Sequence, residues 1–272
     1  MAKTDRAIDQ LGSLQREIKT LRATQSPYCY INTVDPVGGH FVFRLHPSWE
    51  AGTASRWAVI IGEIVHDLRS ALDHLVWQAI DLSGGKPDRG HSFPLLDREP
   101  EEGFVAWATR APSTGNTRHG KLFGACPEAI ALIETYQPFR GTPIGAVLGQ
   151  LDSLWQHDKH RMTLPIVLVA APPRLELEGC ELLGREERME DGILVVEVDV
   201  APQVAKPKVE LSSDAPFDIG YGARPVVDDL LSAAQIVVEM KYGFEELFPD
   251  EEDLRHRQGR AAFDRLISAA AE

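Results

Sequence analysis

The sequence has 272 residues, of which 43% are hydrophobic and 25% charged, a balance typical of folded globular proteins. Its 28 basic and 41 acidic residues give a formal net charge of −13, which repels a phosphate backbone at long range and disfavours nonspecific nucleic-acid binding, while leaving room for a local basic site. The three cysteines are far apart and form no Cys-x-x-Cys motif, so we expect neither a disulfide framework nor a zinc knuckle. We therefore expect the protein to occupy a reducing compartment.

The first predicted element is a helix over residues 3–25 with a narrow apolar seam. Its apolar residues recur at alternating steps of three and four: Ile8, Leu11, Leu14, Ile18 and Leu21. We expect this seam to pack on one partner and to support a homo-oligomer. Residues 28–46 follow as two β-rich runs around DPVGG, the pattern of a hairpin. With no signal peptide and no run near the ~18 apolar residues of a membrane helix, we expect a cytoplasmic protein that does not enter a membrane.

Helices dominate the next part of the chain. A long one is predicted over residues 53–82. Residues 84–126 are rich in loop-forming residues, with one short helix at 100–110. Two further helices are predicted at 127–136 and 143–160, and a connection as long as 84–126 between helices is often functional.

The hydrophobic period then changes towards two. The segments TLPIVLVA, RLELEGCELL, GILVVEVDV and KPKVELS are divided by Pro and Gly, which predicts an antiparallel meander. An amphipathic helix at 225–247 and an acidic tail with a short helix at 249–272 complete the chain. The order predicts an α+β protein in which a helical bundle with a hairpin, residues 1–162, is followed by a β-rich portion with its helix, residues 163–248, in one integrated domain.

The stretch HDLRSALDHLVWQ concentrates chemistry on the long predicted helix. Its polar side chains are His66, Asp67, Arg69, Asp73 and His74. They flank an apolar seam, and large apolar residues also stand on the opposite face, so we expect the helix to be covered on more than one side. A charge that loses water in this way requires a partner.

The predicted partner is the helix that contains LDSLWQHDKHR. Asp158 stands where its core pattern calls for an apolar residue, so we expect Arg69 to pair with Asp158 and His157 and His160 to border the junction. One hypothesis is therefore that this polar cluster is architectural, and that the protein is a non-enzymatic, homodimeric binding or assembly module.

A second hypothesis comes from a resemblance. Arg69 and His74 are separated by four residues on a predicted helix, which resembles the motif of the HEPN ribonuclease superfamily. The resemblance implies cleavage or binding of RNA without a cofactor, commonly at a dimer interface and in a defence or toxin role. Under it His74 takes part in proton transfer and Arg69 holds the phosphate.

A wider resemblance covers residues 57–161. The set HDLRSALDHLVWQ, SFPL, TYQPF and LDSLWQHDKHR, with LRSALDH and DKHR as its most specific parts, is similar to a family of bacterial and phage proteins. The resemblance implies a bacterial or phage origin and supports treating the two helices as one unit, but it implies no activity.

A third hypothesis is a divalent-metal site between the same two helices. His157, Asp158 and His160 would supply ligands, together with His66 or His74 from the long helix. Neither helix carries a complete metal-binding motif, so no metal ligand is assigned from the sequence.

The segment GNTRHGKL, residues 115–122, approximates a phosphate-binding P-loop. Leu122 replaces the hydroxyl residue that would hold magnesium, and no buried strand precedes the segment. We interpret it as a loop in which Arg118 and Lys121, beside Arg110 and His119, contact an anion.

Overall fold

The computed structural model describes residues 2–24, 28–34, 39–47, 51–112, 119–160, 166–170, 174–190, 193–203, 208–212, 217–221 and 224–248. The chain divides into two compact units. A helical unit comprises Met1–Leu14, Ala58–Leu164 and Val226–Glu272, and a sheet unit comprises Gln15–Trp57 and Pro165–Pro225. The predicted acidic tail at 249–272 lies outside the described residues.

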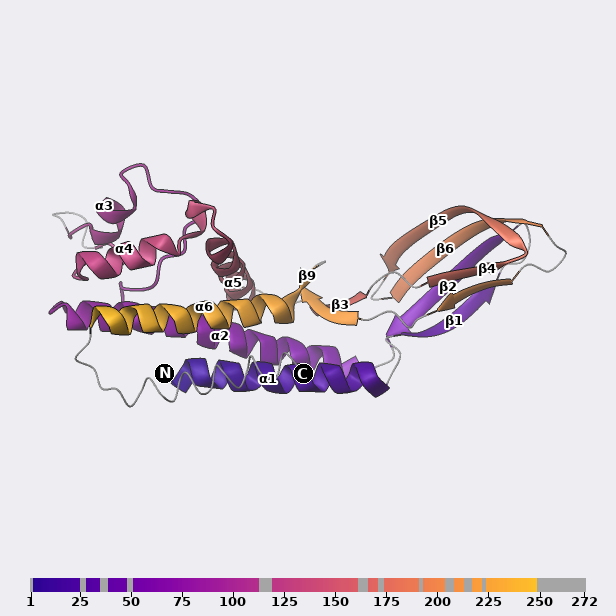
Figure 1. The fold of residues 1–272 in the computed structure, drawn as a ribbon, viewed down its shortest axis with the longest axis horizontal. Helices are drawn as coiled ribbons and strands as arrows, with labels where there is room; N and C mark the ends of the chain where they lie inside the picture. The colour runs from indigo at the N-terminus through magenta and orange to yellow at the C-terminus, as the bar shows by residue number, and fades with distance from the viewer. Residues whose placement is uncertain are drawn as a thin grey trace. The chain divides into compact units, whose positions relative to one another are not determined.

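The predicted α+β class is confirmed (Figure 1). The helices are α1 (Ala2–Thr24), α2 (Ala51–Leu82), α3 (Phe104–Thr109), α4 (Pro127–Thr135), the 3-10 helix η1 (Pro138–Arg140), α5 (Pro143–His160) and α6 (Val226–Leu247). None of these helices is long and apolar enough to cross a membrane. Both α1 and α2 have residues in both units.

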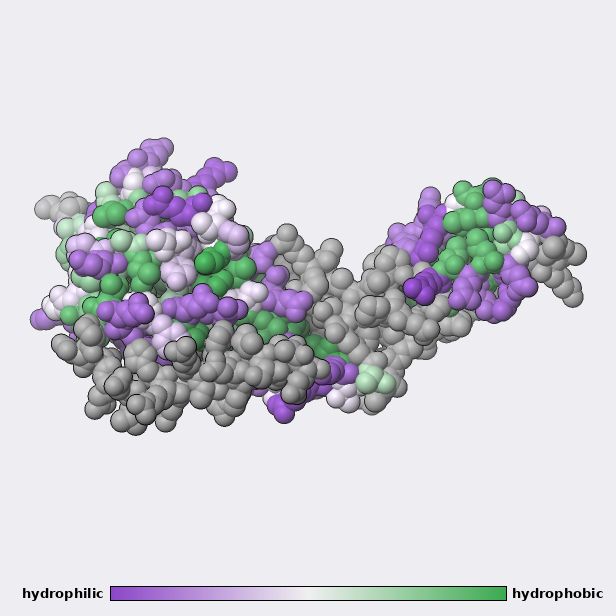
Figure 2. Space-filling model, in the orientation of Figure 1, coloured by the Kyte–Doolittle hydropathy of each residue, from purple (hydrophilic) through white to green (hydrophobic). Residues whose placement is uncertain are grey.

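The helical unit is built on the apolar faces that the sequence predicts. In Figure 1, α2 and α6 run side by side, with α1 on one side of them and α4 on the other. The seam of α2 is the centre of the core, since Ile61, Ile64 and Leu68 have no exposed surface. Hydrophilic side chains cover much of the face of this unit that Figure 2 shows. The layering follows from the 3.6-residue period, which gives each helix an apolar stripe to bury.

The apolar seam of α1 has its partner within the chain. Leu11 has no exposed surface and Leu14 is 1% exposed, so the face predicted to support a homo-oligomer is already covered. On the same helix the Arg6 guanidinium makes two hydrogen bonds to the carboxylate of Asp67 on α2. The structure therefore uses this seam for intramolecular packing.

The sheet unit contains nine strands among the described residues, and every pair is antiparallel. They are β1 (Tyr28–Val34), β2 (His40–Pro47), β3 (Ile166–Ala170), β4 (Arg174–Glu178), β5 (Cys180–Glu190), β6 (Ile193–Pro202), β7 (Lys208–Ser212), β8 (Phe217–Tyr221) and β9 (Arg224–Pro225). They form a four-stranded sheet in the order β1-β2-β6-β5, a three-stranded sheet β3-β8-β9 and a two-stranded ribbon β4-β7. Its buried cluster is made of alternate residues of β2, β6 and β7: Phe41, Phe43, Leu45, Val196, Val198, Val200, Val209 and Leu211.

Strand pairing in this unit differs from a simple meander. Of the strands from β3 to β8, only β5 and β6 are consecutive in the chain and also paired in a sheet. Strand β3 pairs with β8, and β4 pairs with β7. The hairpin β1-β2, assigned from the sequence to the helical bundle, pairs through β2 with β6. Pairing across so long a stretch of chain is decided by which apolar faces meet, and a strand's own periodicity does not specify its partner.

Candidate metal centre

A tight turn at residues 88–91, in the loop after α2, orients two polar side chains the same way. The carboxylate of Asp88 accepts the backbone N–H of Gly90 at 2.7 Å, and the backbone carbonyl of Asp88 accepts the N–H of His91 at 3.1 Å. The backbone N–H of Asp88 in turn donates to Nδ1 of His91 at 2.8 Å. Aspartate and glycine favour such turns because the carboxylate mimics a backbone acceptor. The result is a separation of 3.1 Å between Nδ1 of His91 and Oδ1 of Asp88.

His119 joins this pair from the loop before α4. Its Nε2 lies 2.9 Å from Oδ1 and 3.0 Å from Oδ2 of Asp88. Its ring stacks on that of His91 with centroids 4.1 Å apart and planes 22° from parallel. A Cβ atom at Gly90 would lie 2.6 Å from Cε1 of His119, and one at Gly120 would lie 2.2 Å from the carbonyl oxygen of Ala108. Gly90 is therefore needed for the two loops to approach so closely, and Gly120 is needed for the loop of His119 to lie against the end of α3.

The ring nitrogens that face away from Asp88 are each held by a backbone carbonyl. Nε2 of His91 lies 3.0 Å from the oxygen of Phe123, and Nδ1 of His119 lies 2.8 Å from the oxygen of Gly120. Hydrogen bonds of this kind orient metal-binding histidines in proteins. The remaining atoms, Nδ1 of His91, Nε2 of His119 and a carboxylate oxygen of Asp88, all lie within 4.8 Å of one another.

The electrostatics of the group pair an imidazolium with a carboxylate. The hydrogen bond to the Gly120 carbonyl, followed by the Asp88 carboxylate, raises the pKa of His119 against the opposing effect of burial. The Gly90 N–H, followed by His119, lowers the pKa of Asp88. The His91 side chain is only 2% exposed and that of His119 11%, whereas Asp88 is 59% exposed. The group is thus anchored by two largely buried rings and opens at its carboxylate.

This opening lies on a pocket of about 660 Å³. The residues that line the pocket are Asp88, Arg89, Gly90, Trp107, Arg110, His119, Gly120 and Lys121. Three of them are cationic side chains, in a protein whose formal charge is −13. A small ligand in this pocket would touch Asp88 and His119 directly.

The polar cluster of α2 holds the loop that carries His91. Nη1 of Arg69 donates to Oδ1 of Asp73 at 2.7 Å, and Nη2 donates to the backbone oxygen of Phe93 at 2.6 Å. The backbone N–H of Phe93 donates to Oδ1 of Asp73 at 2.9 Å. Both backbone groups of Phe93 are therefore fixed by α2 two residues after His91, and the indole N–H of Trp77 reaches the His91 carbonyl at 3.3 Å.

The predicted pairing of Arg69 with Asp158 was wrong in its partner. Nε of Arg69 lies 3.5 Å from Oδ1 of Asp152, an ion pair without hydrogen-bond geometry, and the guanidinium lies 5.2 Å from the ring centroid of Trp155. Asp158 does face α2, but at Gly62, where an added Cβ would lie 2.8 Å from its Oδ1. The helical pattern correctly predicted that Asp158 faces α2, but it could not predict which residues of α2 Asp158 lies against.

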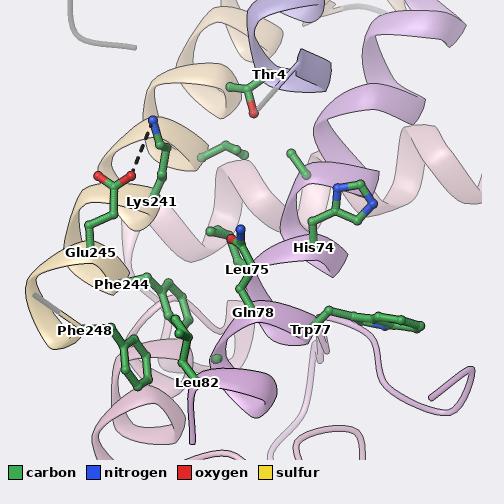
Figure 3. Close-up of a pocket in the computed structure, with 13 residues that line it drawn as sticks. Thr4, His74, Leu75, Trp77, Gln78, Leu82, Lys241, Phe244, Glu245 and Phe248 are labelled. Carbon is green, nitrogen blue, oxygen red and sulfur yellow. Dashed lines mark ion pairs between the residues drawn. The ribbon is translucent and has the colours of Figure 1, made fainter. Parts of the chain in front are cut away.

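Arg69 and His74 do not meet. Arg69 is 7% exposed and enclosed by its partners, whereas His74 is exposed and lines a separate pocket of about 300 Å³ between α1, α2 and α6. Figure 3 shows His74 in that pocket across from Lys241, which is 3.6 Å from Glu245 on α6. The floor of this pocket is apolar and includes Phe244.

The other predicted residues are distributed as follows. His66 is exposed on α2, and Asp67 is fully buried against Arg6 and, at 4.0 Å, Lys3. His157 and Asp158 are half-buried on α5. His160 belongs to α5, but its side chain is not described, and Arg118 lies outside the described residues.

The residues that could hold a metal ion in the structure therefore differ from those expected from the sequence. Among the described residues, the group with suitable geometry is Asp88, His91 and His119, not one that joins α2 to α5. Sequence reasoning placed His119 in an anion-contacting loop and passed over Asp88 and His91. The available signal was Asp-Arg-Gly-His, a turn sequence that brings its first and fourth side chains together. Lys121, predicted to contact an anion, does line the pocket beside this group.

Comparison with protein-family models, with curated proteins and with solved structures found no match for the chain.

Proposed function

We propose that this protein binds a divalent transition-metal ion through Asp88, His91 and His119. The observation that carries the proposal is the convergence of two imidazole nitrogens and a carboxylate oxygen within 4.8 Å, with the other nitrogen of each ring held by a backbone carbonyl. Three protein ligands leave coordination positions open, which distinguishes a site that handles a ligand from a closed structural site.

The donor set indicates which ions fit. Imidazole nitrogen suits Zn²⁺, Co²⁺, Ni²⁺ and Fe²⁺, whereas Mg²⁺ and Ca²⁺ prefer oxygen ligands. On binding, Nε2 of His119 would lose its proton and bond to the ion. Nδ1 of His91 would likewise give up the hydrogen bond that it accepts from the backbone N–H of Asp88 and bond to the ion. A bound ion of this type supplies Lewis acidity to water or to an oxygen of a ligand in the adjoining pocket.

The test is a titration of the metal-free protein with Co²⁺, followed by visible absorption and calorimetry. We expect one ion per chain, no response to Mg²⁺ at the same concentration, and a rise in thermal stability, which at 100 times the dissociation constant amounts to about 2.7 kcal/mol. His119→Gln and Asp88→Asn should each weaken binding at least tenfold.

The matched control is His66→Ala, which removes an exposed imidazole from α2. It should bind Co²⁺ like the unchanged protein. Binding that survives in both His119→Gln and Asp88→Asn, or that is lost equally in His66→Ala, would place the ion elsewhere and refute the proposal.

RNA cleavage of the HEPN type stays a prediction. It requires Arg69 to contact phosphate, yet its guanidinium is engaged by Asp73, the Phe93 carbonyl and Asp152. These contacts favour an architectural role for Arg69. An RNA-cleavage assay of the unchanged protein and His74→Ala tests the hypothesis directly, since exposed His74 can be replaced without loss of packing.

A further inference from the structure

The cationic side chains around the metal centre point to the class of ligand it takes. We propose, on the basis of the metal-binding function above, that the pocket beside Asp88 and His119 binds a phosphoryl group, either free phosphate or a phosphate ester.

Lys121 lies two residues after His119 and lines the same pocket. It is half-buried, and it shares the pocket with Asp88 and His119. An anion there would contact the ion and Lys121 together.

Arg110 and Arg89 extend the positive surface. The Arg110 guanidinium is 52% exposed and is only loosely paired, at 3.8 Å from the carboxylate of Glu102. Arg89 is exposed and forms part of the turn that carries the ligands. Three cations and a divalent ion carry more positive charge than the single carboxylate of the site balances. A phosphoryl group supplies up to two negative charges and several acceptor oxygens.

One residue that lines the pocket is aromatic. This residue, Trp107, is partly exposed, with its ring 6.3 Å from that of Phe104. The pocket volume of about 660 Å³ exceeds the size of free phosphate and is in the range of organic ligands. An aromatic surface next to a phosphoryl site suits an ester with a planar organic group.

The experiment uses the Co²⁺-loaded full chain and follows the ³¹P resonance of inorganic phosphate, which a paramagnetic ion broadens only at close range. A parallel arm replaces phosphate with a nucleoside monophosphate. The variant Lys121→Gln combined with Arg110→Gln removes two of the three cations, and Lys86→Gln, an exposed lysine of the same loop outside the pocket, is the matched control.

We expect broadening in the unchanged protein and in Lys86→Gln, and at least tenfold weaker binding in the double variant. Tighter binding of the nucleoside monophosphate, reduced by Trp107→Leu, identifies an ester, and equal binding identifies free phosphate. If Co²⁺ binds normally but phosphate does not, or if the double variant binds it equally well, the inference is overturned while the metal centre stands. If Co²⁺ does not bind, both proposals fail as stated.

Discussion

Replacement of Arg69 by methionine tests how the helical unit holds its functional loop. The substitution keeps most of the side-chain volume but removes the charge from a residue that is 7% exposed. It deletes the 2.7 Å hydrogen bond to Asp73, the 2.6 Å hydrogen bond to the Phe93 carbonyl and the 3.5 Å ion pair with Asp152. The two carboxylates left behind are 34% and 25% exposed, so water replaces the guanidinium only in part.

Loss of one member of a buried ionic group costs about 3 to 5 kcal/mol because the remaining charges are uncompensated. At ~2 to 4 °C per kcal/mol for a chain of this size, the melting temperature should fall by roughly 6 to 20 °C. Urea denaturation followed by circular dichroism measures the change in unfolding free energy.

The matched control is Arg140→Met in the same unit. The Arg140 side chain is 44% exposed and pairs with Glu134 at the surface, where such a pair contributes about 0 to 1 kcal/mol. If Arg69→Met costs no more than Arg140→Met, the cluster does not stabilise the fold. The contact of Arg69 with Phe93 would then have no structural role, and the ribonuclease hypothesis, which requires a nearly unchanged melting temperature, would gain support.

Three further predictions concern other parts of the helical unit. Asp67→Asn should cost about 2 kcal/mol in unfolding free energy, because it removes the charge from a fully buried hydrogen-bonded carboxylate, whereas Glu63→Gln at the exposed α1–α2 contact should be near neutral in the same urea titration. Burial raises the pKa of Asp152 above its ordinary 3.8 despite the neighbouring arginine, so the native state holds this proton to higher pH than the unfolded state. The unfolding free energy should therefore fall as pH rises from about 4 through the raised pKa of Asp152. Urea titrations across this pH range should show a smaller fall in Asp152→Asn, and an identical pH dependence of the unfolding free energy in the two proteins would refute the assignment. Gly120→Ala places a Cβ 2.2 Å from the Ala108 carbonyl oxygen, so it should destabilise the unit by about 1 to 3 kcal/mol and abolish Co²⁺ binding. Unchanged Co²⁺ absorption would show that the site does not depend on this close contact between the loop of His119 and α3.

The helices could be predicted from the sequence because the spacing of apolar residues within each helix indicates which of its faces is buried. The long helix predicted at 53–82 is Ala51–Leu82, and its seam residues Ile61, Ile64 and Leu68 are fully buried. The large apolar residues on the opposite face, Val59 and Trp77, are 52% and 40% exposed, so the covering of that face expected from them is not found. Trp77 instead uses its indole N–H to contact the loop after α2 at the His91 carbonyl.

Contacts between segments far apart in the chain could not be predicted in the same way. The register of β2 on β6 joins Phe43 to Val196, and neither strand's alternation specifies the other. The contact of His119 with Asp88 spans 31 residues of mostly irregular backbone, for which there is no period to follow. The positive charge of the loop around Lys121 is visible in the sequence, but no pattern in the sequence indicates that a second loop lies against it.

The polar cluster on α2 and the Asp–His group are parts of one arrangement. A ligand on an irregular loop keeps its geometry only if the backbone on both sides of it is fixed. For His91 this is done by Trp77 at its own carbonyl and by Arg69 and Asp73 at both backbone groups of Phe93. Disturbing Arg69 should then weaken Co²⁺ binding as well as stability, even at temperatures where the variant is folded. His119→Gln should weaken binding with a smaller loss of stability, and this difference separates a residue that positions the ligands from one that holds the ion.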